Sequence, residues 1–235
     1  MTTRPISLTS WNLLLILLLL FPASVAWGYR PFVSTDAAVA DVKEIEIELG
    51  YFNWQRERRE NTFGVPSLVI NYGLVPSLEL VGEFALEEPV HGTVRLADPE
   101  VSLKGIIRDG FLQGKSGISL AFEAGLLLPS TDKQEERLGF EALGILSGQL
   151  HGLDYHLNLG GGVDRSQSHP FMLWGMIVEL PISETIRLVG EINGEAARGT
   201  SADSSALIGF IWNAPLPNLA LDAGIRRGIS RATAD

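Results

Sequence analysis

Three carboxylates at alternate positions are the residues of this chain whose spacing bears most directly on chemistry. The stretch KEIEIELGYF places Glu44, Glu46 and Glu48 between aliphatic residues. A β-strand sends successive side chains to opposite faces, whereas a helix would scatter them around its circumference. The segment is therefore expected to be a strand with one acidic and one aliphatic face. An acidic face that lines a pore would favour cations or neutral molecules over anions.

Histidine-based chemistry has no comparable signal. The chain has four histidines: His91, His151, His156 and His169. A serine hydrolase would need one of them within hydrogen-bond reach of an activated serine and an orienting acid, and no motif indicates this. In HGLDYH, His151 and Asp154 are expected in a turn and His156 at the start of a strand, which favours turn chemistry over a metal site. We therefore predict no enzyme, no catalytic residues, no metal and no cofactor.

The GGG stretch at 160–162 is the one glycine cluster that raises the question of phosphate binding. It lacks the spacing and the following helix of a phosphate-binding loop. Close packing of the backbone against its neighbours is the favoured interpretation.

The N-terminus predicts export. Arg4 precedes an apolar run over Leu13–Phe21, and small residues suited to cleavage follow the run. The run is shorter than the roughly 20 residues that a membrane-spanning helix needs. We therefore predict a cleaved signal peptide over 1–26, with cleavage after 28 as the alternative, and a single outer-membrane β-barrel domain over 27–235.

Composition narrows the classes of partner. The chain has no cysteine, which excludes disulfides, thiolate metal sites, a cysteine nucleophile and a lipid-modified N-terminal cysteine. Its net charge is -10, and this becomes about -11 without the signal peptide, which contains one base and no acid. Such acidity argues against a nucleic-acid partner.

Apolar-polar alternation recurs along the chain at the length of β-strands, and no helical periodicity is sustained. The candidate strands run approximately over 43–54, 66–73, 77–87, 99–107, 117–128, 139–149, 155–163, 171–180, 186–196, 205–213 and 219–229. Charged connections such as QRERRENTFG and PSTDKQEERL alternate with tight turns such as HGLD and PISET, and RDGFLQGKSG is a longer exception among the turns. Short turns at one end and longer loops at the other are typical of outer-membrane barrels.

The predicted fold is all-β: an antiparallel up-and-down transmembrane β-barrel of about 11–12 strands. The last predicted strand ends on the loop side, so an even strand number would need a twelfth, returning strand. The chain ends at RRGISRATAD, without the terminal aromatic residue of many such barrels. A truncated product that lacks its last strand is one interpretation, and a miscounted strand is the other.

Extending the alternation separates an apolar face, expected to meet lipid, from a charged face, expected to line a wet interior. The predicted lipid-facing residues are Ile45, Leu49, Leu80, Phe84, Leu103, Leu120, Phe122, Leu157, Met176, Val178, Leu188, Ile192, Phe210 and Leu221. The predicted interior residues are Glu44, Glu46, Glu48, Glu79, Glu83, Glu100, Lys104, Glu123, Glu141, Glu179, Arg187, Glu191, Glu195, Asp222 and Arg226. Two aromatic girdles at the membrane surfaces are predicted from Tyr51, Trp54, Tyr72, Tyr155, Trp174 and Trp212, with ordinary core aromatics as the alternative.

Several stretches, in their order, resemble a known family. RPFVSTDAAVADVKEIEIELGYF is similar to the N-terminal signature of the MetA-pathway of phenol degradation family, and it is followed by INYGLVPSLELVGEF, DPEVSLKGIIRDG, ISLAFEAGLLLPST and GFEALGILSGQLHGLDYHLNLGGGV. The resemblance covers most of the chain after the signal peptide. It implies a transporter-like barrel in the outer membrane of a Gram-negative bacterium, linked by the family's label to aromatic-compound catabolism. It supplies no catalytic residues.

Three classes of function fit these expectations. The leading one is a passive channel or uptake barrel for small solutes, aromatic or hydrophobic ones included. The second is a structural or surface-interaction barrel with a plugged interior, and the third is a soluble periplasmic ligand-binding barrel with its faces inverted. The expected partners are outer-membrane lipid, a small-molecule solute and the barrel-assembly machinery.

Overall fold

A computed structural model describes residues 32–50, 53–57, 60–89, 94–131, 135–166, 168–197 and 202–230. The chain in these ranges is all-β apart from a single-turn 3-10 helix, η1 (Phe111–Gln113). The strands are β1 (Ile45–Gly50), β2 (Asn53–Glu57), β3 (Glu60–Val75), β4 (Leu78–Pro89), β5 (Arg95–Arg108), β6 (Ser119–Leu127), β7 (Gly139–Leu150), β8 (Leu153–Val163), β9 (Pro170–Pro181), β10 (Ile186–Ala197), β11 (Asp203–Asn213) and β12 (Ala220–Gly228). No helix in the described ranges is long and apolar enough to cross a membrane. The predicted signal peptide over 1–26 lies outside them.

All strands belong to one antiparallel sheet in which consecutive strands are neighbours. β1 and β2 both pair with β3, at successive parts of its length, and so occupy one position in the sheet. The predicted all-β, antiparallel, up-and-down arrangement is confirmed, and the strands predicted from 77 onward match β4 to β12 to within a few residues.

One expected loop is a hairpin instead. In QRERRENTFG, at 55–64, the residues 55–57 belong to β2 and 60–64 to β3, and these strands pair from Asn53 opposite Gly64 to Glu57 opposite Glu60. Charged side chains favoured a loop in the sequence, but pairing satisfies the backbone donors and acceptors whatever the side chains are. Strand β3 is therefore longer than predicted.

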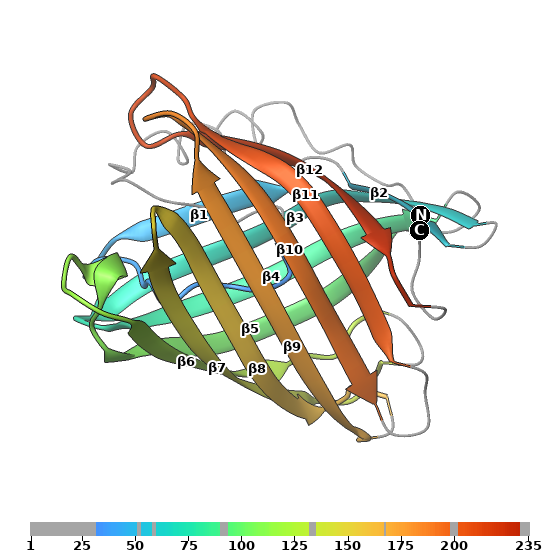
Figure 1. Ribbon diagram of the computed structural model, residues 1–235. Helices are drawn as coiled ribbons and strands as arrows, with labels where there is room; N and C mark the ends of the chain where they lie inside the picture. Colours follow the sequence, from blue (N-terminus) through green and yellow to red (C-terminus); the bar gives the residue numbers. More distant parts are fainter. Residues whose placement is uncertain are drawn as a thin grey trace, which may run out of the picture.

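The sheet curls until its two halves face each other across an interior (Figure 1). Strands β1, β3, β4 and β5 form one wall, and β8 to β12 form the opposite wall (Figure 1). No pairing between described residues joins β1 or β2 to β12, so the sheet is not closed at this seam.

The connections differ between the two ends of the sheet. At the short-turn end, β7 and β8 are joined by His151 and Gly152, which have φ values of 51° and 83°. A two-residue hairpin turn with both residues at positive φ matches the twist of the flanking strands. The connection between β5 and β6 is the longest at this end. It contains η1, which packs against β6 and β7 and turns Gln113 inward.

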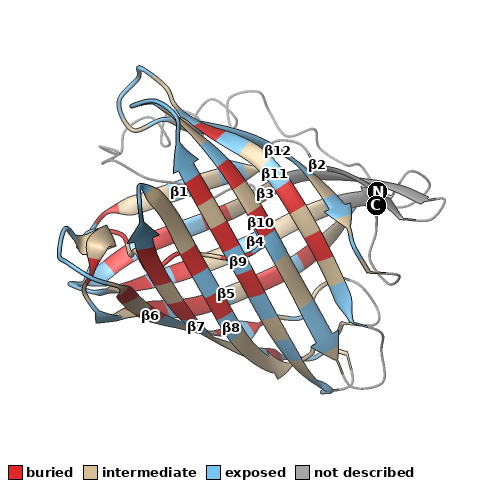
Figure 2. Ribbon diagram, viewed as in Figure 1, coloured by how far each residue is buried: buried red, intermediate tan, exposed pale blue. Residues whose placement is uncertain are grey.

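Side-chain burial alternates along the strands, as the red and pale-blue bands in Figure 2 show. The following predicted lipid-facing residues are exposed: Leu49, Leu80, Phe84, Leu103, Phe122, Leu157, Met176, Leu188, Ile192, Phe210 and Leu221. Ile45, Leu120 and Val178 are half-buried. Polar and charged side chains are buried on the opposite face, among them Glu79, Ser102, Lys104, Ser147, His156, Asn158, Glu179 and Glu191. The sheet is therefore apolar outside and polar inside.

A segment without regular structure crosses this interior before β1 begins. It consists of Phe32–Asp41, here called the strap, and its backbone bonds to side chains of β10, β8, β7 and β4 in turn. The chain then bridges to Gly73 of β3 through Val42 and Lys43 and enters β1. The strap thus connects the two walls of the curled sheet.

Candidate functional site

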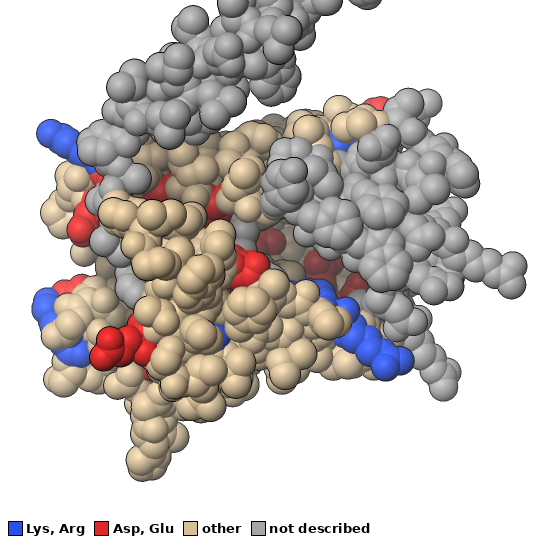
Figure 3. All heavy atoms as spheres, turned by 90° about the horizontal axis from the view of Figure 1, so that it is seen from above, with Lys and Arg blue, Asp and Glu red and all other residues tan. Residues whose placement is uncertain are grey.

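The interior holds a cavity of about 1180 Å³, lined by side chains from both walls and from the strap. Its acidic lining residues are Asp36, Asp41, Glu44, Glu46, Glu48, Glu79, Glu83, Asp98, Glu100, Glu123, Glu135, Glu141, Asp154, Asp164 and Glu195. Its basic lining residues are Lys104, Arg165 and Arg187. Acidic side chains are visible in a hollow of the molecule in Figure 3. The excess of carboxylates gives the cavity a negative potential, because low-dielectric walls concentrate the field of the charges that line them.

The structure brings most of the predicted interior charges to this cavity. Its lining includes Glu44, Glu46, Glu48, Glu79, Glu83, Glu100, Lys104, Glu123, Glu141, Arg187 and Glu195. Glu179, Glu191 and Arg226 form ion pairs beside it rather than lining it. Asp222 is exposed on the edge strand β12, where it lies opposite the buried Ile211 of β11.

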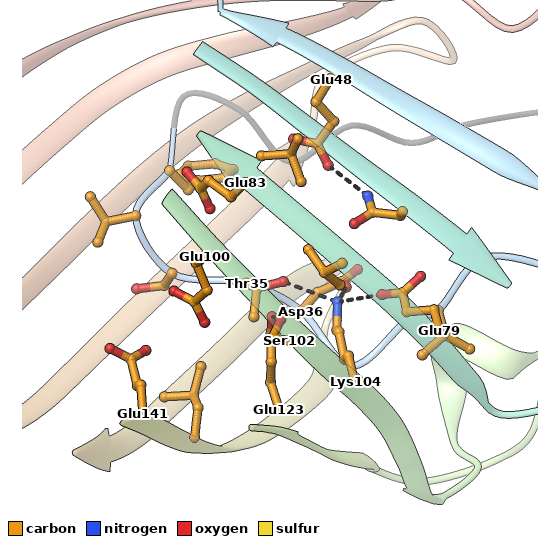
Figure 4. A pocket seen from close by; sticks show the side chains of 18 of the residues that line it. Thr35, Asp36, Glu48, Glu79, Glu83, Glu100, Ser102, Lys104, Glu123 and Glu141 are labelled. Atoms are coloured by element: carbon orange, nitrogen blue, oxygen red, sulfur yellow. Dashed lines mark hydrogen bonds and ion pairs between the residues drawn. The ribbon is translucent and has the colours of Figure 1, made fainter. Parts of the chain in front are cut away.

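Lys104 is the centre of a buried cluster that joins the strap to the wall (Figure 4). Its ammonium nitrogen lies 3.5 Å from Oδ1 of Asp36 and 3.6 Å from Oε1 of Glu79. It also donates to the hydroxyl of Thr35 at 3.1 Å. A buried ammonium is expensive unless it is paired and hydrogen-bonded, so these partners hold the strap in place as well as neutralising the charge.

Away from Lys104, the cavity carboxylates come from neighbouring strands and face one another (Figure 4). Glu123 accepts a hydrogen bond of 2.5 Å from the hydroxyl of Ser102, and Glu48 accepts one of 3.3 Å from the side-chain amide of Asn71. Such a group of carboxylates attracts cations and repels anions.

A second buried chain of polar groups lies across β7, β8, β9 and β10. Oγ of Ser147 is 2.8 Å from Nδ1 of His156, whose Nε2 is 3.6 Å from Oε1 of Glu179. The other oxygen of Glu179 is 3.0 Å from Nη1 of Arg187. Because Oγ of Ser147 accepts a backbone N–H, its own proton can be donated to Nδ1 of His156.

This Ser-His-Glu arrangement was not foreseen from the sequence. Ser147 and His156 are opposite each other in the register of β7 and β8, and a two-residue turn at His151–Gly152 fixes that register. The two-residue turn therefore gave a sequence signal from which the Ser147–His156 contact could have been predicted. The serine side chain is fully buried, and its oxygen accepts the backbone N–H of Ala37 at 3.0 Å. In this arrangement the serine holds the strap and is not open to a substrate.

The HGLDYH stretch, for which turn chemistry was favoured over a metal site, lies in the same region. His151 is exposed in the turn, whereas His156 is buried inside. Asp154 is not in the turn as predicted, since β8 begins at Leu153, and it accepts a hydrogen bond of 2.7 Å from Gln149. In the described part of the chain, no group of three or more His, Asp or Glu residues is arranged to hold a metal ion. The GGG stretch lies in β8, where a Cβ at Gly162 would be 1.8 Å from the carbonyl oxygen of Phe140 in β7, so close backbone packing accounts for it.

Glu191 and Arg226 form a third buried polar cluster, near the seam between β1 and β12. The two side chains are ion-paired, and Arg226 also donates to Asn193 and Ser205, at 2.9 Å each. Glu191 accepts the backbone N–H of Ser34 at 2.7 Å. This predicted interior pair therefore anchors the start of the strap.

Arg165, in the loop between β8 and β9, was also missed by the sequence analysis. It donates to the carbonyl oxygens of Leu128 and Pro99, at 2.9 and 3.2 Å, and pairs with Asp98 at 3.0 Å. Its guanidinium thus ties the β8–β9 and β6–β7 connections to β5 at the loop end. Only the folded arrangement brings these distant carbonyls within its reach.

The predicted girdle residues lie near the strand ends where they can be described. Tyr72 and Trp212 are exposed and Tyr155 is half-buried, all toward the short-turn end, and Trp174 is exposed toward the loop end. Tyr51 lies outside the described residues, and Trp54 is described only by its backbone, in β2.

Comparison with known proteins gave no assignment: no family model matches the chain, and a search of curated proteins found no match. The resemblance to the MetA-pathway of phenol degradation family stays a prediction from the quoted motifs.

Proposed function

We propose that this protein is an outer-membrane β-barrel that admits small cationic or neutral solutes to an acidic interior. The observation that carries the proposal is the inverted distribution of side chains, with aliphatic and aromatic residues exposed outside and charges buried inside. Soluble monomers rarely expose contiguous apolar patches beyond a few hundred Å². Transmembrane barrels have an apolar outer band and a polar interior.

The proposal requires that the seam between β1 and β12 be paired in the membrane. Lipid offers no hydrogen bonds to strand edges, so open edges do not occur in the hydrocarbon layer. The curl of the sheet supports this requirement, because its two walls already face each other across an interior (Figure 1). A closed barrel is expected to migrate differently on a gel before and after boiling.

The charge and size of the cavity support the solute class. Carboxylates far outnumber basic groups in its lining, which favours cations and neutral molecules over anions. Its volume of about 1180 Å³ is slightly above the usual range of small-molecule sites. Aromatic solutes are added only by analogy, from the resemblance to the phenol-degradation family.

A structural barrel with a plugged interior is the second candidate, and the strap across the interior favours it. In that case the protein would act through its loops. A soluble periplasmic binding barrel is not supported, because it would need to bury the aliphatic face and expose the acids.

The test is ion conductance of the detergent-folded protein in a planar bilayer under a potassium chloride gradient. Cation-selective conductance steps are expected, because the cavity lining is acidic. The variants are Glu48→Gln with Glu123→Gln, which replace two carboxylates of the cavity lining without changing their shape, and they should reduce cation selectivity. Anion selectivity in the unmodified protein would contradict the proposal, and absence of conductance would favour the plugged structural barrel.

A further inference from the structure

The strap is held along its whole length by side chains of the sheet interior. Glu191 accepts the N–H groups of Val33 and Ser34, and Asn158 accepts that of Thr35 at 2.8 Å. Further along, Ser147 accepts the N–H of Ala37 and Glu79 accepts that of Ala40 at 2.6 Å. Backbone groups buried away from water need partners. Here the interior side chains supply partners that an irregular segment cannot provide for itself.

The walls also make room for the strap. A Cβ built on Gly175 of β9 would lie 1.9 Å from Oγ of Ser34, and one built on Gly73 of β3 would lie 1.9 Å from the carbonyl oxygen of Asp41. Real Cβ atoms do not approach other atoms this closely, so a larger residue at either position requires the strap to shift. The glycines mark the points where the strap touches each wall.

Apolar contacts fix the start and the middle of the strap. Phe32 packs against the cluster of Val189, Leu207 and Ile211 on β10 and β11. Ala37 is fully buried against Ala121 and Ile145 on β6 and β7. The strap therefore has a specific seat in the interior.

We propose that the strap is an internal plug that obstructs the solute path while it is seated, and that the path of the unmodified protein opens transiently whenever the Asp36–Lys104 contact is released. This inference rests on the proposed function, since it names the element that regulates the same cavity. The plug lies between β10 and β4, across the part of the interior nearest the short-turn end. It is held chiefly by polar contacts, which water can replace when the segment leaves its seat.

The absence of cysteine allows the strap to be followed directly. Ser34→Cys introduces one thiol of nearly the same shape at a buried strap position, and a water-soluble maleimide reports whether the strap has left its seat. Asp36→Asn weakens the contact with Lys104 while keeping the side-chain shape. Asp41→Asn is the matched control, because it removes the same charge from an exposed side chain of the same segment.

A disulfide between the strap and β9 provides the opposite test, because it holds the strap in place. In Ser34→Cys with Gly175→Cys, the two Cβ atoms start 3.0 Å apart. A disulfide needs about 3.5–4.5 Å, so it forms after a small outward shift of the strap. Oxidation joins the strap to β9 and a reductant frees it again, and no other disulfide can form within the chain.

The thiol introduced by Ser34→Cys should be labelled slowly when it is the only change. Labelling should be about tenfold or more faster when Asp36→Asn is added, because breaking one partner of a buried ion pair is strongly destabilising. Asp41→Asn should leave the labelling rate unchanged. Conductance in planar bilayers should rise with Asp36→Asn, fall to background in the oxidised double-cysteine protein, and return on reduction.

Two outcomes separate the inference from the proposed function. If the unmodified protein conducts and the oxidised double-cysteine protein conducts equally, the strap is no plug, while the channel itself stands. If the protein with Ser34→Cys and Asp36→Asn inserts into membranes and is labelled rapidly but stays silent, no solute path exists even without the strap. That second result overturns the proposed function and the plug with it.

Discussion

Lys104 shows how one residue joins the fold to the site. It lies on β5, yet its ammonium contacts two strap residues, Thr35 and Asp36, and Glu79 on β4. The alternation along β5 predicted that Lys104 points inward, because period two assigns each residue to a face. Its strap partners could not be predicted, since the strap has no periodic pattern and its contacts span most of the chain.

A second single residue, Gly73, leads to a testable prediction. Gly73→Ala should lower the free energy of unfolding by about 1–3 kcal/mol, as overpacking does in a filled interior, because the added methyl group would meet the carbonyl oxygen of Asp41. Gly82→Ala is the control, since a Cβ there has no neighbour within 4 Å. Urea unfolding in lipid vesicles measures both, and equal stabilities of the two variants would mean that the strap does not rest on β3.

The strands show which elements a sequence can predict. Alternation over β4 to β12 indicated their positions and faces, because each strand needs an apolar side outward and a polar side inward. The buried chain of Ser147, His156 and Glu179 required the register between strands as well. The β2–β3 hairpin was missed because charge in a connection indicates solvent contact, which an extended hairpin also provides.

A prediction at the level of the strands concerns the outer face of β5, which should meet lipid. Leu103 is exposed near the middle of this strand, so Leu103→Lys should destabilise the protein in lipid by about 2–4 kcal/mol. Leu216→Lys makes the same change at an exposed leucine in the β11–β12 connection and should cost little. Unfolding titrations in vesicles compare the two. An equal, small cost at both positions would place Leu103 in water rather than lipid.

At the scale of the whole molecule, two features act together. The curled sheet separates an apolar exterior from a charged interior, and the strap bridges the interior between its walls. The first feature follows from strand periodicity and could be predicted. The second depends on where the chain folds back before β1, which local patterns do not encode. The proposed channel and its plug therefore rest on observations of different kinds.

The most direct test of the account asks which face of the sheet meets lipid. Phe122 and Glu123 are adjacent on β6 and point to opposite faces, and in a chain without cysteine each can be replaced singly by a cysteine that carries a fluorophore. In vesicles, brominated lipid should quench the label at 122 and leave that at 123 bright, while acrylamide, a neutral quencher in the water, should quench chiefly the label at 123. Strong quenching of both labels by acrylamide and of neither by brominated lipid would contradict the membrane-spanning barrel.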